Sequence, residues 1–221
     1  MLPVRSDRHR AGAGLISIPT SGDGRNMRIG LLGGSFNPAH AGHLMLARRA
    51  LRALRLDQVW LMVSPGNPLK PSKGMAPFRV RLASAERIAD GRRIVATDIE
   101  SRLGQRFTVK TVGLLKQRFP HVRFVWLMGA DGLAQLSHWK RWRRLAAIVP
   151  IAVLPRPGSV SPALRGGAAS VLRHQRRPSR ESPVLAERKG NAWTFLSAPQ
   201  NDISATALRE SGQFRPDSDQ E

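Results

Sequence analysis

The 221-residue sequence has no cysteine and few acidic residues. Without cysteine the chain has no disulfide, no thiol nucleophile and no cysteine-ligated metal site. Its 15 aspartates and glutamates stand against 36 lysines and arginines, which gives a formal net charge of +21. Long apolar runs are missing too, because no stretch approaches the ~20 residues that a bilayer-spanning helix needs. We therefore expect a soluble, cytoplasmic protein without a membrane partner.

The excess of positive charge by itself suggests nucleic acid or another polyanion as a partner. Thirty of the 36 basic residues are arginines, however, and they are scattered over predicted helices and loops. An arginine-biased genome produces the same pattern. We therefore expect no nucleic-acid partner, and a basic nucleic-acid-binding module is kept as the alternative from a different functional class.

The length and the succession of apolar runs and amphipathic segments predict a single α/β domain over residues 27–214. Its sheet is predicted to be doubly wound and mostly parallel. Residues 156–190 contain eight basic residues, four prolines and four glycines, and this composition predicts a mobile basic loop within the domain.

Both ends of the chain are predicted to be tails. Residues 1–26 have one apolar patch, Leu15–Ile18, which is too short for a signal-peptide core. The segment is predicted to be disordered, with Met27 as a plausible true start. Residues 215–221 are predicted to form a C-terminal tail.

One stretch near the amino end combines a buried strand, two glycines and a helix start. Arg28–Leu32 is a short apolar run typical of a buried parallel strand, and Gly33-Gly34 is predicted to turn the backbone sharply because neither residue has a Cβ. An amphipathic helix is predicted from His43 to Arg55. Unpaired N–H groups and the helix dipole at its amino end favour an anion, so the turn is predicted to bind phosphate.

Two histidines, His40 and His43, accompany this turn. A metal site would require a third suitable ligand, and the sequence has neither cysteine nor an HExxH motif, so we predict no protein-held metal. A purely structural role for both rings in the core is a second alternative. Imidazole N–H groups beside a phosphate site favour a third interpretation, in which they stabilise charge on a transferring phosphoryl group.

The segment Gly33–His43, with its His-Ala-Gly-His ending, resembles the signature of the HxGH nucleotidylyltransferases. The longer context is similar to bacterial nicotinate-nucleotide adenylyltransferases, since further family-like blocks follow in order: Pro65–Lys70, Phe107–Thr111, Gly129–Asp131, Trp139 and Ile203–Arg209. The resemblance covers residues 28–212. Three positions depart from the family pattern: Asn37 stands where aspartate is more frequent, Leu69 where histidine is common, and Phe107 where tyrosine is usual.

The resemblance implies an enzyme that joins ATP and nicotinate mononucleotide to give nicotinate adenine dinucleotide and pyrophosphate, with Mg²⁺ arriving on ATP. It implies His40, His43 and Arg209 as catalytic residues. The implied acceptor site contains Thr108, which receives the nicotinate carboxylate, and Trp139, which stacks on the pyridine ring. The implied ATP-binding residues are Gly33, Gly34, Ser35, Phe36, Lys70, Asp131, Ser204 and Thr206.

The residue pattern alone leaves simpler alternatives open. Thr108 and Asp131 stand at predicted helix starts and could be plain caps, and Lys70 could be a solvated loop residue. Trp139 and Trp142 are three apart, so on a helix both would face the same way and one could be core. Another nucleotidylyltransferase of the same fold, with nicotinamide mononucleotide or phosphopantetheine as acceptor, is the alternative within the class.

Overall fold

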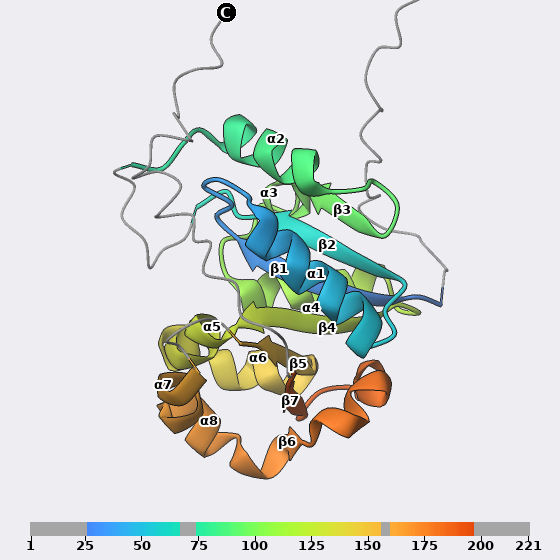
Figure 1. The fold of residues 1–221 in the computed structure, drawn as a ribbon, viewed down its shortest axis with the longest axis vertical. Helices are drawn as coiled ribbons and strands as arrows, with labels where there is room; N and C mark the ends of the chain where they lie inside the picture. Colours follow the sequence, from blue (N-terminus) through green and yellow to red (C-terminus); the bar gives the residue numbers. More distant parts are fainter. Residues whose placement is uncertain (1–25, 67–73, 156–159, 197–221) are drawn as a thin grey trace, which may run out of the picture.

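The computed structural model describes residues 26–66, 74–155 and 160–196. Figure 1 shows one sheet with helices on both of its faces. The sheet order is β3-β2-β1-β4-β5-β7-β6 and every neighbouring pair is parallel, so the predicted doubly wound α/β fold is confirmed. The strands are β1 (Arg28–Gly34), β2 (Gln58–Val63), β3 (Ile94–Thr97), β4 (Arg123–Gly129), β5 (Ile151–Leu154), β6 (Arg176–Arg177) and β7 (Trp193–Phe195).

Helices connect the strands and cover the sheet. None of those in the described ranges is long and apolar enough to cross a membrane. The α-helices are α1 (Ala41–Ala53), α2 (Phe78–Ile88), α3 (Ile99–Arg102), α4 (Thr108–Arg118), α5 (Ala130–Gln135), α6 (Trp142–Ile148), α7 (Val160–Arg165) and α8 (Gly167–Val171). Three 3₁₀ segments are described as well: η1 (Leu136–His138), η2 (Arg173–Gln175) and η3 (Ser179–Glu187).

Alternation along the strands divides the core into two layers. In β4, Phe124, Trp126 and Met128 belong to the layer that α4 and α6 cover. Val125 and Leu127 face the other layer, which α1 covers and to which α2 contributes. The central strands are therefore buried on both faces, which explains why they read as continuous apolar runs in the sequence.

The chain order places a topological switch beside β1. The chain proceeds from β1 outward to β2 and β3, then returns to the other side of β1 to form β4 and β5. In open α/β sheets, ligands bind in the crevice at the carboxyl ends of the strands that flank such a switch. Here those strands are β1 and β4, which end at Gly34 and Gly129.

The predicted mobile loop at 156–190 differs from the structure over residues 160–190, which form α7, α8, η2, β6 and η3. Small apolar residues are the physical reason: Ala163, Ala168, Ala169 and Leu172 are buried in one core layer and Leu185 in the other. Figure 1 shows this segment at the β5–β7 end of the sheet. Its basic and glycine-rich composition concealed these scattered anchors.

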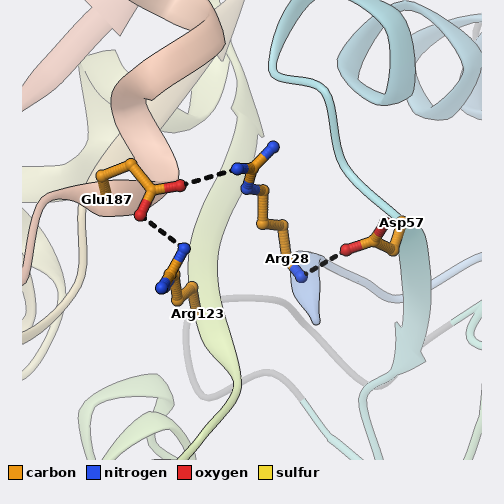
Figure 2. Close-up of polar contacts among 4 residues, drawn as sticks. All are labelled: Arg28, Asp57, Arg123 and Glu187. Carbon is orange, nitrogen blue, oxygen red and sulfur yellow. Dashed lines mark hydrogen bonds and ion pairs between the residues drawn. The ribbon is translucent and has the colours of Figure 1, made fainter. Parts of the chain in front are cut away.

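Glu187 links η3 to the amino ends of two central strands. Its carboxylate pairs with the guanidinium of Arg28 at 3.0 Å and with that of Arg123 at 2.6 Å (Figure 2). The backbone N–H of Arg28 also donates to Asp57 at 2.7 Å. These side chains are about one-third exposed or more, so water screens the ion pairs and we expect them to fix geometry more than they add stability. They lie at the strand ends opposite the topological switch.

Candidate active site

The turn after β1 is built differently from the predicted glycine turn. Gly33 and Gly34 are the last residues of the strand, and the residue with left-handed backbone is Phe36, at φ 49°. Its ring is buried and packs against the imidazole of His43, with 4.9 Å between ring centroids. The side chain of Phe36 therefore belongs to the core, and only its backbone is left for the predicted nucleotide contact.

Gly33 is required for a different reason, which is the close approach of an indole. A Cβ at this position would lie 2.6 Å from the ring of Trp126, which is buried in the core. Trp126 in turn packs edge-on against Trp139, with ring centroids 6.1 Å apart and planes at 85°. A chain of contacts thus joins the end of β1 to the tryptophan predicted to stack on the pyridine ring.

His40 and His43 close the amino end of α1 by a reciprocal cap. His40 is the N-cap residue, and its Nδ1 accepts the N–H of Gly42 at 3.1 Å. His43 Nδ1 accepts the backbone N–H of His40 at 3.2 Å, and the two ring centroids are 3.9 Å apart. Because each Nδ1 is an acceptor, each neutral ring carries its proton on Nε2. Both rings are therefore structural caps and oriented N–H donors at once.

Arg81 of α2 ties the ends of two strands together. Its Nη1 donates to Ser35 O and to Ser64 O, both at 2.8 Å, and its Nε donates to Ala76 O at 3.0 Å. The residue is 3% exposed, and burial lowers the pKa of its guanidinium. A guanidinium removed from water is stable only where acceptors satisfy its N–H groups. Arg81 therefore fixes the turn after β1 relative to the end of β2.

Asn37 and Ser84 hold the same turn from two further directions. The Asn37 amide donates to Gly74 O at 2.9 Å and accepts the N–H of Ala76 at 3.1 Å. Ser84 Oγ accepts the N–H of Ala39 at 3.0 Å. A buried asparagine supplies both a donor and an acceptor here, whereas an ionised aspartate has only acceptors. This accounts for asparagine at position 37, where the family more often has aspartate.

Thr108 is the first residue of α4, and the N-cap is Phe107, without a side-chain cap. The plain-cap alternative for Thr108 is therefore wrong. One turn later, Thr111 Oγ1 donates to the carboxylate of Glu100 at 2.9 Å, and the Ser64 hydroxyl bonds that carboxylate as well. The start of α4 is thus connected to the end of β2, whose Ser64 N–H donates to Gly34 O at 2.9 Å.

The remaining predicted residues fall at the carboxyl end of β4 and beyond. Asp131 lies in the first turn of α5, where Gly129 is the N-cap, so Asp131 is not the cap. Trp139 has extended backbone between η1 and α6, which means that the two tryptophans do not share a helix face. Trp142 is 8% exposed and belongs to the core, as its simpler interpretation predicted.

Four predicted site residues lie outside the described residues: Lys70, Ser204, Thr206 and Arg209. Sequence reasoning also missed several residues that build the site. In α2, Arg81 and Ser84 each stand four residues before an apolar residue, Ala85 and Ile88. This helical spacing in the sequence could have placed both on the buried face of the helix. Glu100 and Trp126 carried no such signal, because their partners come from distant segments.

Comparison with known proteins shows the family and supports the fold. The cytidylyltransferase-like family model matches residues 31–211. A protein of Gluconobacter oxydans (strain 621H), named a probable nicotinate-nucleotide adenylyltransferase, is 99% identical over 195 residues, which are 88% of this chain and 100% of that protein. A protein of the same name from Gluconacetobacter diazotrophicus is 66% identical over 195 residues, 88% of this chain and 91% of its own length. The solved structure of Plasmodium falciparum nicotinic acid mononucleotide adenylyltransferase complexed with NaAD shares the fold, with a TM-score of 0.63, 17% identity and 83% of each chain covered.

Replacing Arg81 by lysine tests whether its hydrogen bonds fix the turn after β1. A lysine ammonium cannot reach three carbonyls in the fork geometry of a guanidinium, so buried acceptors lose charged donors. We expect Arg81→Lys to lower the free energy of unfolding by about 2–4 kcal/mol in urea. The matched control is the exposed Arg79 on the same helix, where Arg79→Lys should change stability by about 0.5 kcal/mol or less. Equal unfolding curves for the two variants would contradict the role of Arg81.

Glu100 gives a prediction for pH. Burial raises the pKa of its carboxyl group above the ordinary value of 4.5, and the hydroxyls of Thr111 and Ser64 oppose the rise. The folded protein then binds more protons than the unfolded chain between the two pKa values, so this group costs stability as pH rises through that window. We expect the Tm of Glu100→Gln to gain on wild type as pH increases from 4 to 7.5.

Thr111→Val should have the opposite pH dependence of Tm to Glu100→Gln. It removes a donor to the carboxylate, so its Tm should fall further below that of wild type as pH rises. Tm measured by circular dichroism against pH decides the matter, and parallel curves for the three proteins would show that Glu100 is not the responsible group.

Proposed function

Because the chain belongs to the nicotinate-nucleotide adenylyltransferase family, we propose that it transfers the adenylyl group of ATP to nicotinate mononucleotide in NAD biosynthesis. The products are nicotinate adenine dinucleotide and pyrophosphate. The observation that carries the proposal is the reciprocal cap of His40 and His43 at the amino end of α1, the helix that follows β1 at the topological switch where nucleotides bind in this class of sheet.

In the proposed reaction the 5′-phosphate of nicotinate mononucleotide attacks the α-phosphorus of ATP, and the bond to the pyrophosphate leaving group breaks. The attacking phosphate is already a competent nucleophile, so no covalent enzyme intermediate is required. Catalysis then consists of holding two anions in line and neutralising the charge that develops. Alignment of this kind can contribute about 7–11 kcal/mol.

The rigidity of the turn supports this assignment. Each histidine is held through Nδ1 by a backbone N–H, so Nε2 can donate to phosphate oxygens without reorganising. The backbone N–H groups of Ser35 and Phe36, and those at the start of α1, are assigned to the ATP phosphates. Asp131 is assigned to ribose hydroxyls, and Lys70, Ser204, Thr206 and Arg209 to the nucleotide and the pyrophosphate.

Nucleotidyltransferases that use ATP generally employ a divalent cation, and we assign Mg²⁺ to this role. Among residues 26–66, 74–155 and 160–196, no three histidine, aspartate or glutamate side chains are grouped to hold a metal ion. Mg²⁺ commonly keeps several waters and binds through substrate phosphates, so the residues present suit an ion that arrives on ATP. Both substrates are water-soluble small molecules, and we propose the cytoplasm as the compartment.

The direct test is pyrophosphate release from ATP with each candidate acceptor in turn: nicotinate mononucleotide, nicotinamide mononucleotide and phosphopantetheine. Release with the first acceptor at the highest kcat/KM supports the proposal. A higher value with either of the others would move the chain to another branch of the same fold.

Two substitutions at His43 separate its cap from its chemistry. His43→Asn keeps an acceptor near the position of Nδ1 and removes Nε2, so we expect a normal Tm with kcat lower by about 10²–10³-fold. His43→Gln places an amide N–H nearer to Nε2 and should retain more turnover while losing the cap, at about 0.5–2 kcal/mol of stability. Wild-type turnover in a folded His43→Asn protein would refute the assigned role.

Selectivity for the acid over the amide tests the acceptor site. A carboxylate gains charge-assisted hydrogen bonds from Thr108 and nearby backbone N–H groups, whereas the amide brings a donor to a site of donors. We expect nicotinate mononucleotide to be preferred over nicotinamide mononucleotide by at least about tenfold in kcat/KM.

Variants at the two assigned residues should differ in effect. Thr108→Val should erode the preference, while Trp139→Ala should raise KM for both acceptors, because stacking does not distinguish them. Trp139→Phe is the conservative control for the packing against Trp126. Equal kcat/KM for acid and amide in the wild-type enzyme would contradict the assigned acceptor.

A further inference from the structure

A groove of about 750 Å³ lies between α4 and α6, on the layer opposite α1 and α2. None of its lining residues is a predicted site residue. Its apolar lining residues are Phe107, Val109, Leu114 and Ile148. The volume is in the range of about 300–1,000 Å³ that is typical of small-molecule sites.

Positive charge is concentrated around this groove. Five of the twelve lining residues are basic, namely Lys110, Lys116, Lys140, Arg141 and Arg144, and none is acidic. In the whole chain, 36 of 221 residues are lysine or arginine, so the lining is more than twice as basic as the protein. The general excess of arginine therefore does not account for it.

Backbone carbonyls partner one of these cations, because Lys116 Nζ donates to Ile148 O at 2.5 Å and to Lys189 O at 3.4 Å. Among the described residues, none of the five is paired with a carboxylate. Burial and then the nearby Lys189 ammonium lower the pKa of Lys116. Lys140 lies over the ring of Phe107, with 4.6 Å from its Nζ to the ring centroid. An anion in the groove would be attracted by several charges at once.

Gly113 supplies an independent observation. It lies inside α4, where glycine costs about 1 kcal/mol relative to alanine. Its φ is not positive, and a Cβ there would meet no atom within 4 Å, so neither backbone conformation nor packing requires the glycine. It lines the groove, so its missing side chain leaves more of the groove open to a ligand.

We propose that the groove between α4 and α6 is a second binding site, which takes an organic phosphate with a planar ring. The basic lining residues would hold the phosphate, while Phe107 and the apolar lining residues would receive the ring. The amphipathic lining distinguishes this ligand from a bare inorganic anion. The site is separate from the adenylyl-transfer site and does not depend on the proposed reaction.

The position of the groove gives it a route to the acceptor site. Phe107 and Lys140 line the groove, and each is the chain neighbour of an assigned acceptor residue, Thr108 and Trp139. A ligand held by α4 and by the segment before α6 would therefore contact the two elements that present those residues.

Pyridoxal 5′-phosphate is a suitable probe because it carries both features and reports its position. Its aldehyde condenses with a lysine amine, water leaves, and borohydride reduces the imine to a stable adduct that peptide mass mapping locates. The chain has six lysines, of which three line the groove. We expect saturable labelling of Lys110 and Lys140.

Variants with matched controls complete the test. Arg144→Glu and Gly113→Phe should each lower labelling of Lys110 and Lys140 by about tenfold, the first by removing a phosphate contact and the second by filling part of the groove. Arg87→Glu makes the same charge change on α2, in the opposite layer, and should leave labelling within about twofold, as screening of distant charges predicts. An equal loss in Arg87→Glu or no loss in Arg144→Glu would overturn the proposal.

Discussion

The arrangement of the active site depends on one buried cation. A guanidinium removed from water is tolerated only where its N–H groups meet acceptors in the right places, and Arg81 meets three backbone carbonyls from three segments. Each carbonyl belongs to a chain section that could otherwise shift: the turn after β1, the end of β2 and the approach to α2. The requirement to satisfy Arg81 therefore selects one geometry for the turn, and the helix that carries it is part of the site and not merely scaffold.

The same principle recurs around the switch point. His40 and His43 exchange bonds with the backbone, and Glu100 joins the end of β2 to α4 through Ser64 and Thr111. In each case a polar side chain is held by backbone or by another side chain before any ligand arrives. Donors fixed in this way need not reorganise as charge develops, which is where electrostatic catalysis gains most over water. A site of this construction suits a reaction that needs positioning more than acid–base chemistry.

Features of the fold and the site could be predicted where their signal lies in contiguous residues, and not where it depends on distant partners. The buried strands, the helix starts at positions 108 and 130 and the paired histidines are contiguous patterns, and the structure has them within a few residues. Residues 160–190 were misread because a few buried alanines and leucines, not the average composition, decide whether a segment packs. The turn after β1 was predicted for its glycines, but its left-handed residue is Phe36, stabilised by packing that spans distant segments. Glu100 likewise has partners that no spacing in the sequence reveals.

Trp126 shows why such distant contacts matter for the site. Its indole occupies the space where a side chain at position 33 would lie, and it also packs edge-on against Trp139. The end of β1 and the proposed ring-stacking residue are thus two sides of one packed unit. Because a packed core transmits displacement with little compression, a change in the indole at position 126 would move both sides together. The relative placement of the proposed phosphate site and the proposed acceptor site is therefore set by the core of the sheet, through the packing between β1 and β4.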